Sequence, residues 1–361
     1  MIGKLQDFPW AALEPHLHRA AQHPDGLVNL AFGTPVDPTP DVVRRALREA
    51  ADAPGLPRTE GVPELREAVA RWIRERIGAD VAPDAVLPVV GSKELIAWLP
   101  ALLRVQPHEK VAFPALGFPT FRASAVLAGA VPFEYAGLAE LRAERPRVVW
   151  LNSPSNPDGR VLGAAELRAV VEWAREHGAL VVNDECYLDH GWETEPVSVL
   201  HPEVCGTDQH GVLAVHSLSK RSNMAGYRAG SVAGDPGVIR DLLEVRRHAG
   251  FVVPAPVQAA MVAALGDEDH VTAQRERYRR RRAALREALE QAGFRVERSE
   301  ASLFLWATLD QPCWDTVRDL ADLGVLVSPG ELYGPDGARH VRIAFTATDA
   351  QIEAACARLA A

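Results

Sequence analysis

The residue with the clearest potential for chemistry is Lys220, which lies in the segment His216–Arg221 (HSLSKR) directly after an apolar run. The chain has four lysines and thirty-five arginines, so arginine carries almost all of its positive charge. A lysine amine, unlike a guanidinium, can lose its proton and form a Schiff base with an aldehyde when its surroundings lower its pKa. The alternative is an ordinary surface lysine after a buried strand, and the neighbouring motifs decide between the two.

Several other side chains near the ends of apolar runs can bind an anion such as phosphate. They are Ser92, Lys93, Ser217, Ser219 and Arg228. The first two lie at the start of a helix expected from Glu94 to Leu103, where free N–H groups and the helix dipole attract negative charge. A Gly-Ser pair is also an ordinary helix start, so this motif alone does not establish a phosphate site.

A third group of residues suits a flat, nitrogen-containing ring. Phe118 can lay its aromatic face on such a ring, and Asn156 can donate a hydrogen bond to a ring oxygen. Asp184 can hold a protonated pyridine nitrogen, while Tyr187 can hydrogen-bond a phenolate oxygen. Taken singly, each residue also suits core packing, a turn or a helix cap.

Short apolar runs precede these candidates and predict strands that are buried on both faces. The runs are Val86–Val90, Val111–Phe113, Val148–Leu151, Leu180–Val182 and Val212–Val215, with a further strand expected at Arg228–Gly234. Amphipathic stretches between them predict helices, so the fold class is α/β with a mainly parallel sheet. Ligands bind at the carboxyl ends of the strands in such sheets, which brings the candidates together.

The 361-residue length exceeds the usual size of one compact core, so we expect two domains. A long helix is predicted from about Glu268 to Gln291, and the tail predicts strands at Leu303–Ala307 and Val341–Phe345 around a helix near Cys313–Leu323. The predicted boundaries are 1–40 for an N-terminal arm that joins the small domain, 41–240 for a large domain, and 241–361 for a smaller α+β domain.

Composition argues against several classes of protein. The net charge of −9 disfavours a nucleic-acid or anionic-membrane surface, and the basic run Arg275–Arg282 is interpreted as a solvated helix face opposite Leu285 and Leu289. Four scattered cysteines and the histidines near residue 20 lack metal-ligand spacing, so no metal is expected. Without an export signal or a membrane-spanning run, we expect a cytoplasmic protein with no membrane partner.

The order of the motifs resembles the class I and II aminotransferases, the fold-type I pyridoxal-phosphate enzymes related to aspartate aminotransferase. The resemblance rests on Asn156–Gly159 (NPDG), Asp184 with Tyr187, Ser217–Lys220 (SLSK) and Arg228. Asn29–Pro35, Gly55–Arg66 and Val341–Phe345 extend it over nearly the whole chain. It implies a large domain with a mainly parallel seven-stranded sheet, a smaller α+β domain, and a homodimer with shared active sites.

The resemblance also implies a role for each matching residue. Lys220 would be catalytic, holding pyridoxal 5′-phosphate and shuttling a proton between the substrate Cα and the cofactor. The cofactor-binding residues would be Ser92, Lys93, Phe118, Asn156, Asp184, Tyr187, Ser217, Ser219, Lys220 and Arg228. Arg342 would grip the substrate α-carboxylate in a bidentate fork, Asn156 would contact the substrate, and Gly33 would leave room beside that carboxylate.

One position departs from the family pattern. Leu56 stands where the family usually has a tyrosine that reaches the cofactor phosphate of the neighbouring subunit. The missing hydrogen bond would cost on the order of 1.5–3 kcal/mol of cofactor-binding free energy. This loss is tolerable because several other donors to the phosphate remain. We therefore expect slightly weaker cofactor retention rather than inactivity.

Other segments are similar to the actinobacterial type of N-succinyldiaminopimelate aminotransferase. They are Phe8–Trp10, Gly33–Pro40, Gly91–Glu94 and Ser219–Gly230. This similarity implies amino exchange between glutamate/2-oxoglutarate and N-succinyl-2-amino-6-oxopimelate in lysine biosynthesis, with Arg58 and Arg221 as candidates for the distal carboxylates. A different aminotransferase, a pyridoxal-phosphate lyase and a non-catalytic regulatory module remain as alternatives.

Overall fold

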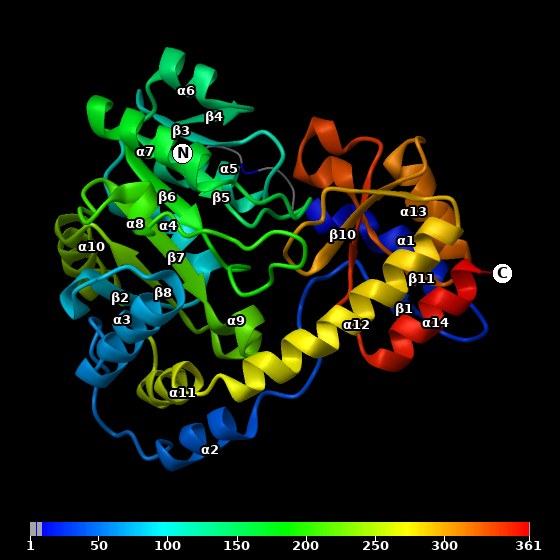
Figure 1. Cartoon of the computed structure of the whole chain (residues 1–361), viewed down its shortest axis with the longest axis horizontal. Coiled ribbons are helices and arrows are strands. Elements are labelled where there is room, and N and C mark those ends of the chain that lie inside the picture. Colours follow the sequence, from blue (N-terminus) through cyan, green and yellow to red (C-terminus); the bar gives the residue numbers. More distant parts are fainter. Residues whose placement is uncertain (1–4, 6–8, 361) are drawn as a thin grey trace.

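The computed structural model describes residue 5 and residues 9–360, so Phe8 of the Phe8–Trp10 segment lies outside the described residues. Its strands form three sheets of seven, four and two strands (Figure 1). We use "large-sheet region" for the seven-stranded sheet with helices α2–α11, and "small-sheet region" for the other two sheets with α1 and α12–α14. The α/β fold class and the seven-stranded sheet are as the sequence predicted.

The large sheet has the strand order β2-β8-β7-β6-β5-β3-β4. Its strands are β2 (Val86–Val89), β3 (Lys110–Pro114), β4 (Val131–Tyr135), β5 (Val148–Asn152), β6 (Leu180–Asp184), β7 (Val212–Ser217) and β8 (Gly230–Gly234). Strand β8 pairs antiparallel with both of its neighbours, and the pairs among β3 to β7 are parallel. The predicted apolar runs therefore correspond to six of the seven strands.

The run that the sequence did not single out is the edge strand β4. Its Val131 is 39% exposed, and Pro132 lies within it. An edge strand needs hydrogen bonds on one side only and does not require a continuous apolar run.

Alternate residues of the central strands face two separate layers of helices. Val149 and Val181 pack with α3 (Pro63–Ile77), α7 (Ala164–His177) and α11 (Ala255–Leu265). Trp150 and Val182 pack with α4 (Ser92–Leu102), α5 (Thr120–Ala128) and α10 (Pro236–Ala249). Burial on both faces explains why these strands are continuous Val/Leu runs rather than alternating ones.

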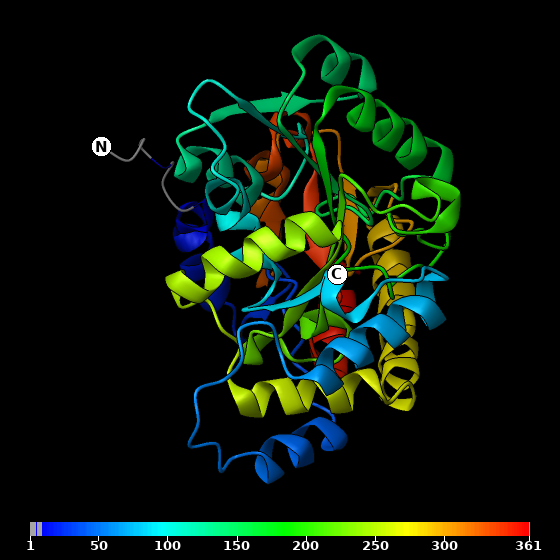
Figure 2. The same cartoon turned by 90° about the vertical axis from the view of Figure 1, so that its left-hand side faces the viewer.

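Shorter elements complete the large-sheet region. They are α2 (Asp41–Glu49), α6 (Leu138–Glu144), α8 (Pro202–Cys205) and α9 (Leu218–Arg221). Helix α2 lies beside α11 at the bottom of the view (Figures 1 and 2), and the loop that carries Leu56 runs from α2 to α3. Helix α9 directly follows β7 and contains Lys220.

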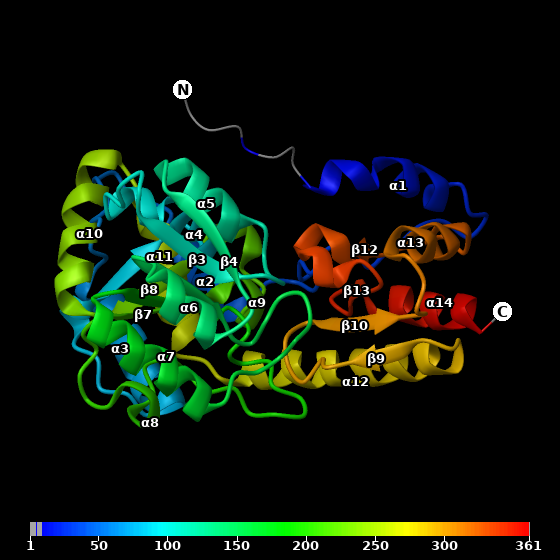
Figure 3. The same ribbon diagram turned by 90° about the horizontal axis from the view of Figure 1, so that it is seen from above.

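The small-sheet region combines the N-terminal segment with the tail of the chain. Its strands are β1 (Val28–Asn29), β9 (Arg295–Glu297), β10 (Phe304–Thr308), β11 (Val325–Leu326), β12 (Ser328–Pro329) and β13 (Val341–Ala344). Its helices are α1 (Glu14–Ala21), α12 (Asp269–Gln291), α13 (Cys313–Asp322) and α14 (Asp349–Leu359). Helix α12 runs from the large-sheet region along β9 and β10 (Figure 3).

The basic run on α12 is only partly the solvated face that the sequence predicted. Leu285 and Leu289 are buried as expected. Arg281, however, is also buried, because it makes a bidentate ion pair with Asp37 and a second ion pair with Asp349. The run therefore fastens α12 to the N-terminal segment and to α14.

No helix within residues 9–360 combines the length and the apolar surface needed to cross a bilayer.

Candidate active site

A cavity of about 520 Å³ lies where the carboxyl ends of the large-sheet strands meet the small-sheet region. It collects all twelve of the predicted site residues. They are Gly33, Ser92, Lys93, Phe118, Asn156, Asp184, Tyr187, Ser217, Ser219, Lys220, Arg228 and Arg342. Residues up to 309 positions apart in the sequence are thus neighbours in space, and their individual roles remain predictions.

Lys220 reaches the cavity from α9, immediately after β7. Its amine donates a hydrogen bond to the backbone oxygen of Gly33. Burial of the amine lowers the pKa of Lys220 to about 8, and the positive charges of Arg342 and Arg228 act in the same direction. About a tenth of this amine is therefore unprotonated at pH 7, and the neutral fraction, which a nucleophile or proton acceptor requires, grows as the pH rises toward 8.

Asp184 is the last residue of β6, and its buried carboxylate lines the cavity. One of its oxygens accepts a hydrogen bond from the Cys186 N–H at 3.2 Å. Burial raises the pKa of Asp184 to about 6, because the charged form is poorly solvated. A cationic N–H in the cavity would stabilise the charged carboxylate, so the position suits a protonated ring nitrogen.

Tyr187 lies one turn further on and is also buried. Its ring meets Phe304 edge to face, with 5.6 Å between centroids and a 70° angle. Burial raises the pKa of Tyr187, so its hydroxyl stays protonated and able to donate.

One end of the cavity is suited to a phosphate, and we call Gly91, Ser92, Ser217 and Arg228 the anion cup. A Cβ added at Gly91 would lie 2.3 Å from Arg228 Nη2, so only a glycine lets the guanidinium sit against this turn. Gly91 (φ +77°) and Arg228 (φ 55°) both have left-handed backbone conformations, which are uncommon for a non-glycine residue. The cup therefore combines a cation, hydroxyl groups and the N-terminus of α4.

The opposite end of the cavity is built around Arg342 on β13. Its Nη1 donates to Asn156 Oδ1 at 2.8 Å, and its Nη2 donates to the Ala31 oxygen at 2.6 Å. The guanidinium lies 3.9 Å from the Phe304 ring centroid and 4.9 Å from that of Tyr333. These contacts hold the plane of the guanidinium fixed, which suits bidentate recognition of a carboxylate.

Gly33 and Phe118 line the same space. A Cβ on Gly33 would lie 2.2 Å from Phe304 Cε1, so the close approach of this backbone to the ring requires glycine. Phe118 is half-buried, and the Lys93 amine lies 5.7 Å from its ring centroid.

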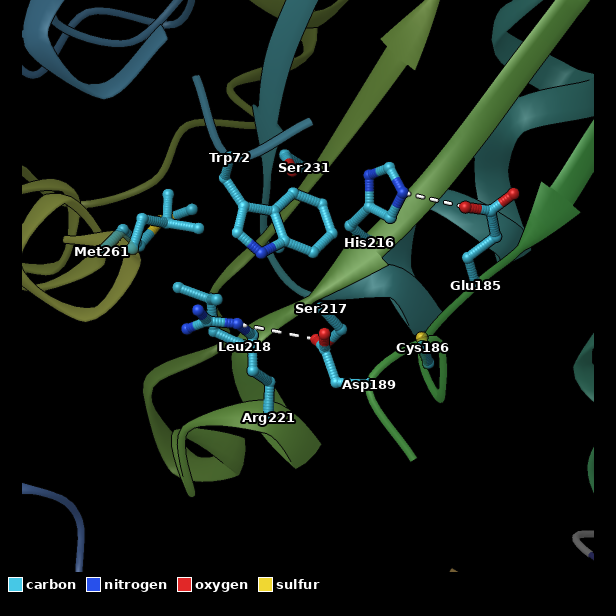
Figure 4. Close-up of a pocket in the computed structure, with 12 residues that line it drawn as sticks. Trp72, Glu185, Cys186, Asp189, His216, Ser217, Leu218, Arg221, Ser231 and Met261 are labelled. Atoms are coloured by element: carbon cyan, nitrogen blue, oxygen red, sulfur yellow. Dashed lines mark hydrogen bonds and ion pairs between the residues drawn. The ribbon is translucent and has the colours of Figure 1, made fainter. Parts of the chain in front are cut away.

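A second, much smaller cavity of about 20 Å³ adjoins the first and shares Cys186 and Ser217 with it (Figure 4). In this cavity His216 contacts Glu185 at 3.0 Å, and the Trp72 ring meets His216 edge to face. Both side chains are buried, and His216 lies on β7, shortly before the α9 helix that carries Lys220.

Arg221 also lines the small cavity. This side chain is buried and pairs with Asp189 and with Glu268 at the start of α12. It therefore faces away from the large cavity, and the interpretation of Arg221 as a ligand for distal carboxylates is wrong. Arg58 is exposed on the loop before α3 and does not line the cavity of its own chain, so its role remains a prediction.

Eight lining residues were not among the predicted site residues. They are Trp10, Phe32, Thr34, Ile96, Cys186, Ala225, Gly226 and Phe304. Most lie within motifs that the sequence already marked. Phe304 had no such signal, because its contact with Arg342 depends on the antiparallel pairing of β10 with β13.

Comparison with known proteins identifies the family of this chain. The family model "Aminotransferase class I and II" matches residues 25–359. The 4-dedimethylamino-4-oxo-anhydrotetracycline transaminase OxyQ of Streptomyces rimosus is 63% identical over 358 residues, which cover 99% of this chain and 100% of that protein. An LL-diaminopimelate aminotransferase of Dehalococcoides mccartyi is 33% identical, covering 92% and 90% respectively. A Thermus thermophilus aspartate aminotransferase mutant superposes with a TM-score of 0.87 at 26% identity, covering 99% and 97%.

Proposed function

Because the chain belongs to the class I and II aminotransferases, whose cofactor is pyridoxal 5′-phosphate, we propose that it moves an amino group between glutamate and the keto group of N-succinyl-2-amino-6-oxopimelate. Aminotransferase activity follows from the family. The choice of this keto acid is the specific proposal, and the observation that supports it is the fixed guanidinium of Arg342, which suits a substrate with a carboxylate beside its keto group.

The residues of the cavity fit the cofactor. The anion cup offers Arg228 and a helix N-terminus to its phosphate, and the Gly91–Arg228 contact leaves no room for a larger residue in the turn. Asp184 offers a buried carboxylate to its ring nitrogen. Lys220 offers an amine of lowered pKa to its aldehyde. Asn156 accepts from Arg342 through Oδ1, so its amide N–H groups can point to the ring oxygen beside Tyr187.

When bound, pyridoxal 5′-phosphate supplies an aldehyde for amines and a ring that withdraws electron density from the substrate. The protein supplies orientation and proton transfer. Asp184 would hold the protonated ring nitrogen, Tyr187 would donate to the ring oxygen, and Lys220 Nζ would take and return the proton of the substrate Cα. Arg342 would bind the carboxylate beside that carbon and so orient the substrate within the cavity.

Arg342 can bind a substrate carboxylate in both halves of the reaction. Glutamate and N-succinyl-2-amino-6-oxopimelate each carry a carboxylate next to the reacting carbon, and the guanidinium held by Asn156 and Ala31 can bind either. This match supports a keto acid as the second substrate.

A polycyclic ketone is the second candidate, because the OxyQ relative is 63% identical and is named for a 4-oxo-anhydrotetracycline. The aromatic side chains of Trp10, Phe32, Phe118 and Phe304 around the cavity suit such a ring system. A ketone without a neighbouring carboxylate would leave Arg342 unused in the second half of the reaction.

The test separates the two half-reactions. The cofactor-loaded protein is treated with glutamate until its visible band has bleached, and each keto substrate is then added to restore the band. We expect N-succinyl-2-amino-6-oxopimelate to restore it, and Arg342→Gln to slow both halves. Restoration by a polycyclic ketone alone, with Arg342→Gln slowing only the glutamate half, would establish the second candidate instead.

We also propose that the protein acts as a homodimer with shared sites. Leu56 is 99% exposed in the single chain, and Phe32 at the cavity is 45% exposed, so two large apolar side chains are left uncovered, one of them at the cavity. A light-scattering mass measurement of the loaded enzyme is expected to give twice the chain mass. A stable, active monomer would contradict this assembly.

A further inference from the structure

Behind the anion cup lies a buried ion pair that the roles described above do not use. Arg246 on α10 has no exposed surface, and Glu94 on α4 is 14% exposed. The guanidinium binds the carboxylate with two hydrogen bonds, of 2.8 Å and 3.0 Å. Its carbon also lies 5.2 Å from the Phe251 ring centroid. Burying such a pair costs desolvation free energy, and the fold retains the pair despite that cost.

The carboxylate of this pair lies against the turn that forms the cup. Glu94 Oε2 accepts the Val90 N–H at 3.1 Å, so the side chain folds back over the backbone that leads into Gly91 and Ser92. Gly91 is the residue at which an added Cβ would collide with Arg228 Nη2. Glu94 thus holds the turn from the third position of α4, and it places a negative charge beside the site of another anion.

That charge has opposite effects on the turn and on the ligand. A carboxylate near a helix N-terminus is stabilised by the free N–H groups and the dipole, and it orders the turn. The same carboxylate repels a phosphate at that terminus and competes for the same dipole. A cation that binds the carboxylate from behind removes the repulsion and leaves the hydrogen bond to Val90 in place.

We propose that Arg246 is a positioning residue that neutralises Glu94, so that the turn at Gly91 stays ordered while the N-terminus of α4 remains available to the cofactor phosphate. The inference rests on the proposed function, because it takes the anion cup to be the phosphate site. It predicts an effect on the phosphate alone. A role restricted to packing α10 against α4 would instead alter the whole cavity.

Equilibrium binding of pyridoxal 5′-phosphate and of pyridoxal, which lacks the phosphate, separates these two roles. In Arg246→Met, Glu94 is left charged, and we expect the dissociation constant of pyridoxal 5′-phosphate to rise about tenfold while that of pyridoxal changes less than about twofold. In the double variant Arg246→Met with Glu94→Gln, both charges are gone, and phosphate affinity should return to within about twofold of the parent. Arg247→Met, on the exposed side of α10, is the matched control.

Glu94→Gln alone keeps the test usable if Arg246→Met does not fold. The amide oxygen can take the place of Oε2 and still accept from Val90 and from Arg246 Nη2, so the turn is kept while the negative charge and the bond from Arg246 Nη1 are lost. Pyridoxal 5′-phosphate should then bind as tightly as in the parent or severalfold more tightly, with pyridoxal unchanged.

Two results would overturn the proposal. One is an equal loss of both ligands in Arg246→Met, and the other is weaker binding of pyridoxal 5′-phosphate in Glu94→Gln. Arg228→Met tells this failure apart from failure of the cup. If that variant keeps the parent's preference for pyridoxal 5′-phosphate over pyridoxal, the phosphate binds elsewhere and the proposed site itself is wrong.

Discussion

The two ends of the active-site cavity are built in different ways. At the anion cup, Gly91, Ser92, Ser217 and Arg228 all lie at the ends of strands β2, β7 and β8 of one sheet, whose mutual register is fixed by hydrogen bonds. At the other end, Arg342 lies on β13 of a different sheet and reaches across to Asn156 in the large-sheet region. The first end depends on pairing within one sheet, and the second depends on packing between two regions.

From this difference we expect each end to have its own task. A site whose backbone is set by adjacent strands holds one geometry, which suits a cofactor that stays bound through each reaction cycle. A site that spans two packed regions can adjust when one substrate replaces another. Substitutions in the cup should therefore act on cofactor retention, and those near Arg342 on the choice and turnover of substrates.

Lys220 connects the two ends, so its loss should have the largest effect. In Lys220→Ala, the glutamate half-reaction is expected to slow at least about a thousandfold, because the cavity loses its nucleophile and its proton acceptor together. Stopped-flow absorbance of the loaded protein measures the rate, and circular dichroism checks the fold. Lys110→Ala, a lysine on β3 that pairs with Glu144, is the control. Full activity in the Lys220 variant would remove the central assignment.

Arg342→Gln should affect only the substrate end. Losing two charge-assisted hydrogen bonds to the substrate is expected to lower kcat/KM for glutamate by about a hundredfold to a thousandfold, with cofactor affinity unchanged. Steady-state kinetics and a cofactor titration of the same sample measure the two effects. The exposed Arg339→Gln is the matched control. Loss of cofactor affinity as large as the loss of kcat/KM would show that the two ends do not act separately.

The sequence could predict the cup more fully than the substrate end. Ser92, Ser217 and Arg228 lie within short motifs next to apolar runs, and a buried parallel sheet brings the ends of neighbouring strands to one edge. Strand β4 was not singled out because an edge strand with Pro132 has no continuous apolar run. The contacts of Arg342 with Phe304 and Tyr333 arise from sheet register and loop packing, which leave no local pattern.

Arg221 is a residue that its local sequence placed in the cavity incorrectly. Its position next to Lys220 suggested a ligand in the cavity, but consecutive residues of a helix point about 100° apart, so the neighbour of an inward side chain faces elsewhere. Its partner Glu268 is 47 residues away and could not be inferred. The predicted domain boundaries at residues 40 and 240 likewise stay predictions.

The titration of Lys220 gives the next prediction in size. Its pKa of about 8 means that the neutral, reactive amine becomes more abundant as the pH rises toward 8. The rate at which cofactor-free protein captures pyridoxal 5′-phosphate should therefore increase about tenfold per pH unit below that value and level off above it. Pyridoxine 5′-phosphate, which has no aldehyde, is the control and should lack this step. A midpoint above pH 10 would mean that burial does not lower the pKa of the amine.

The smallest expected effect comes from Leu56, which sits outside both ends of the cavity in its own chain. If sites are shared in a homodimer, Leu56→Tyr should restore a hydrogen bond to the phosphate of the neighbouring subunit and slow cofactor loss on dilution by about tenfold, which corresponds to the low end of the 1.5–3 kcal/mol range. Leu56 is 99% exposed, so the larger ring meets no obstacle within the chain. Leu56→Phe adds the same ring without the hydroxyl and is the control. Equal loss rates for the tyrosine and phenylalanine variants would mean that the hydroxyl reaches no phosphate, and that the cup retains the cofactor without help from this loop.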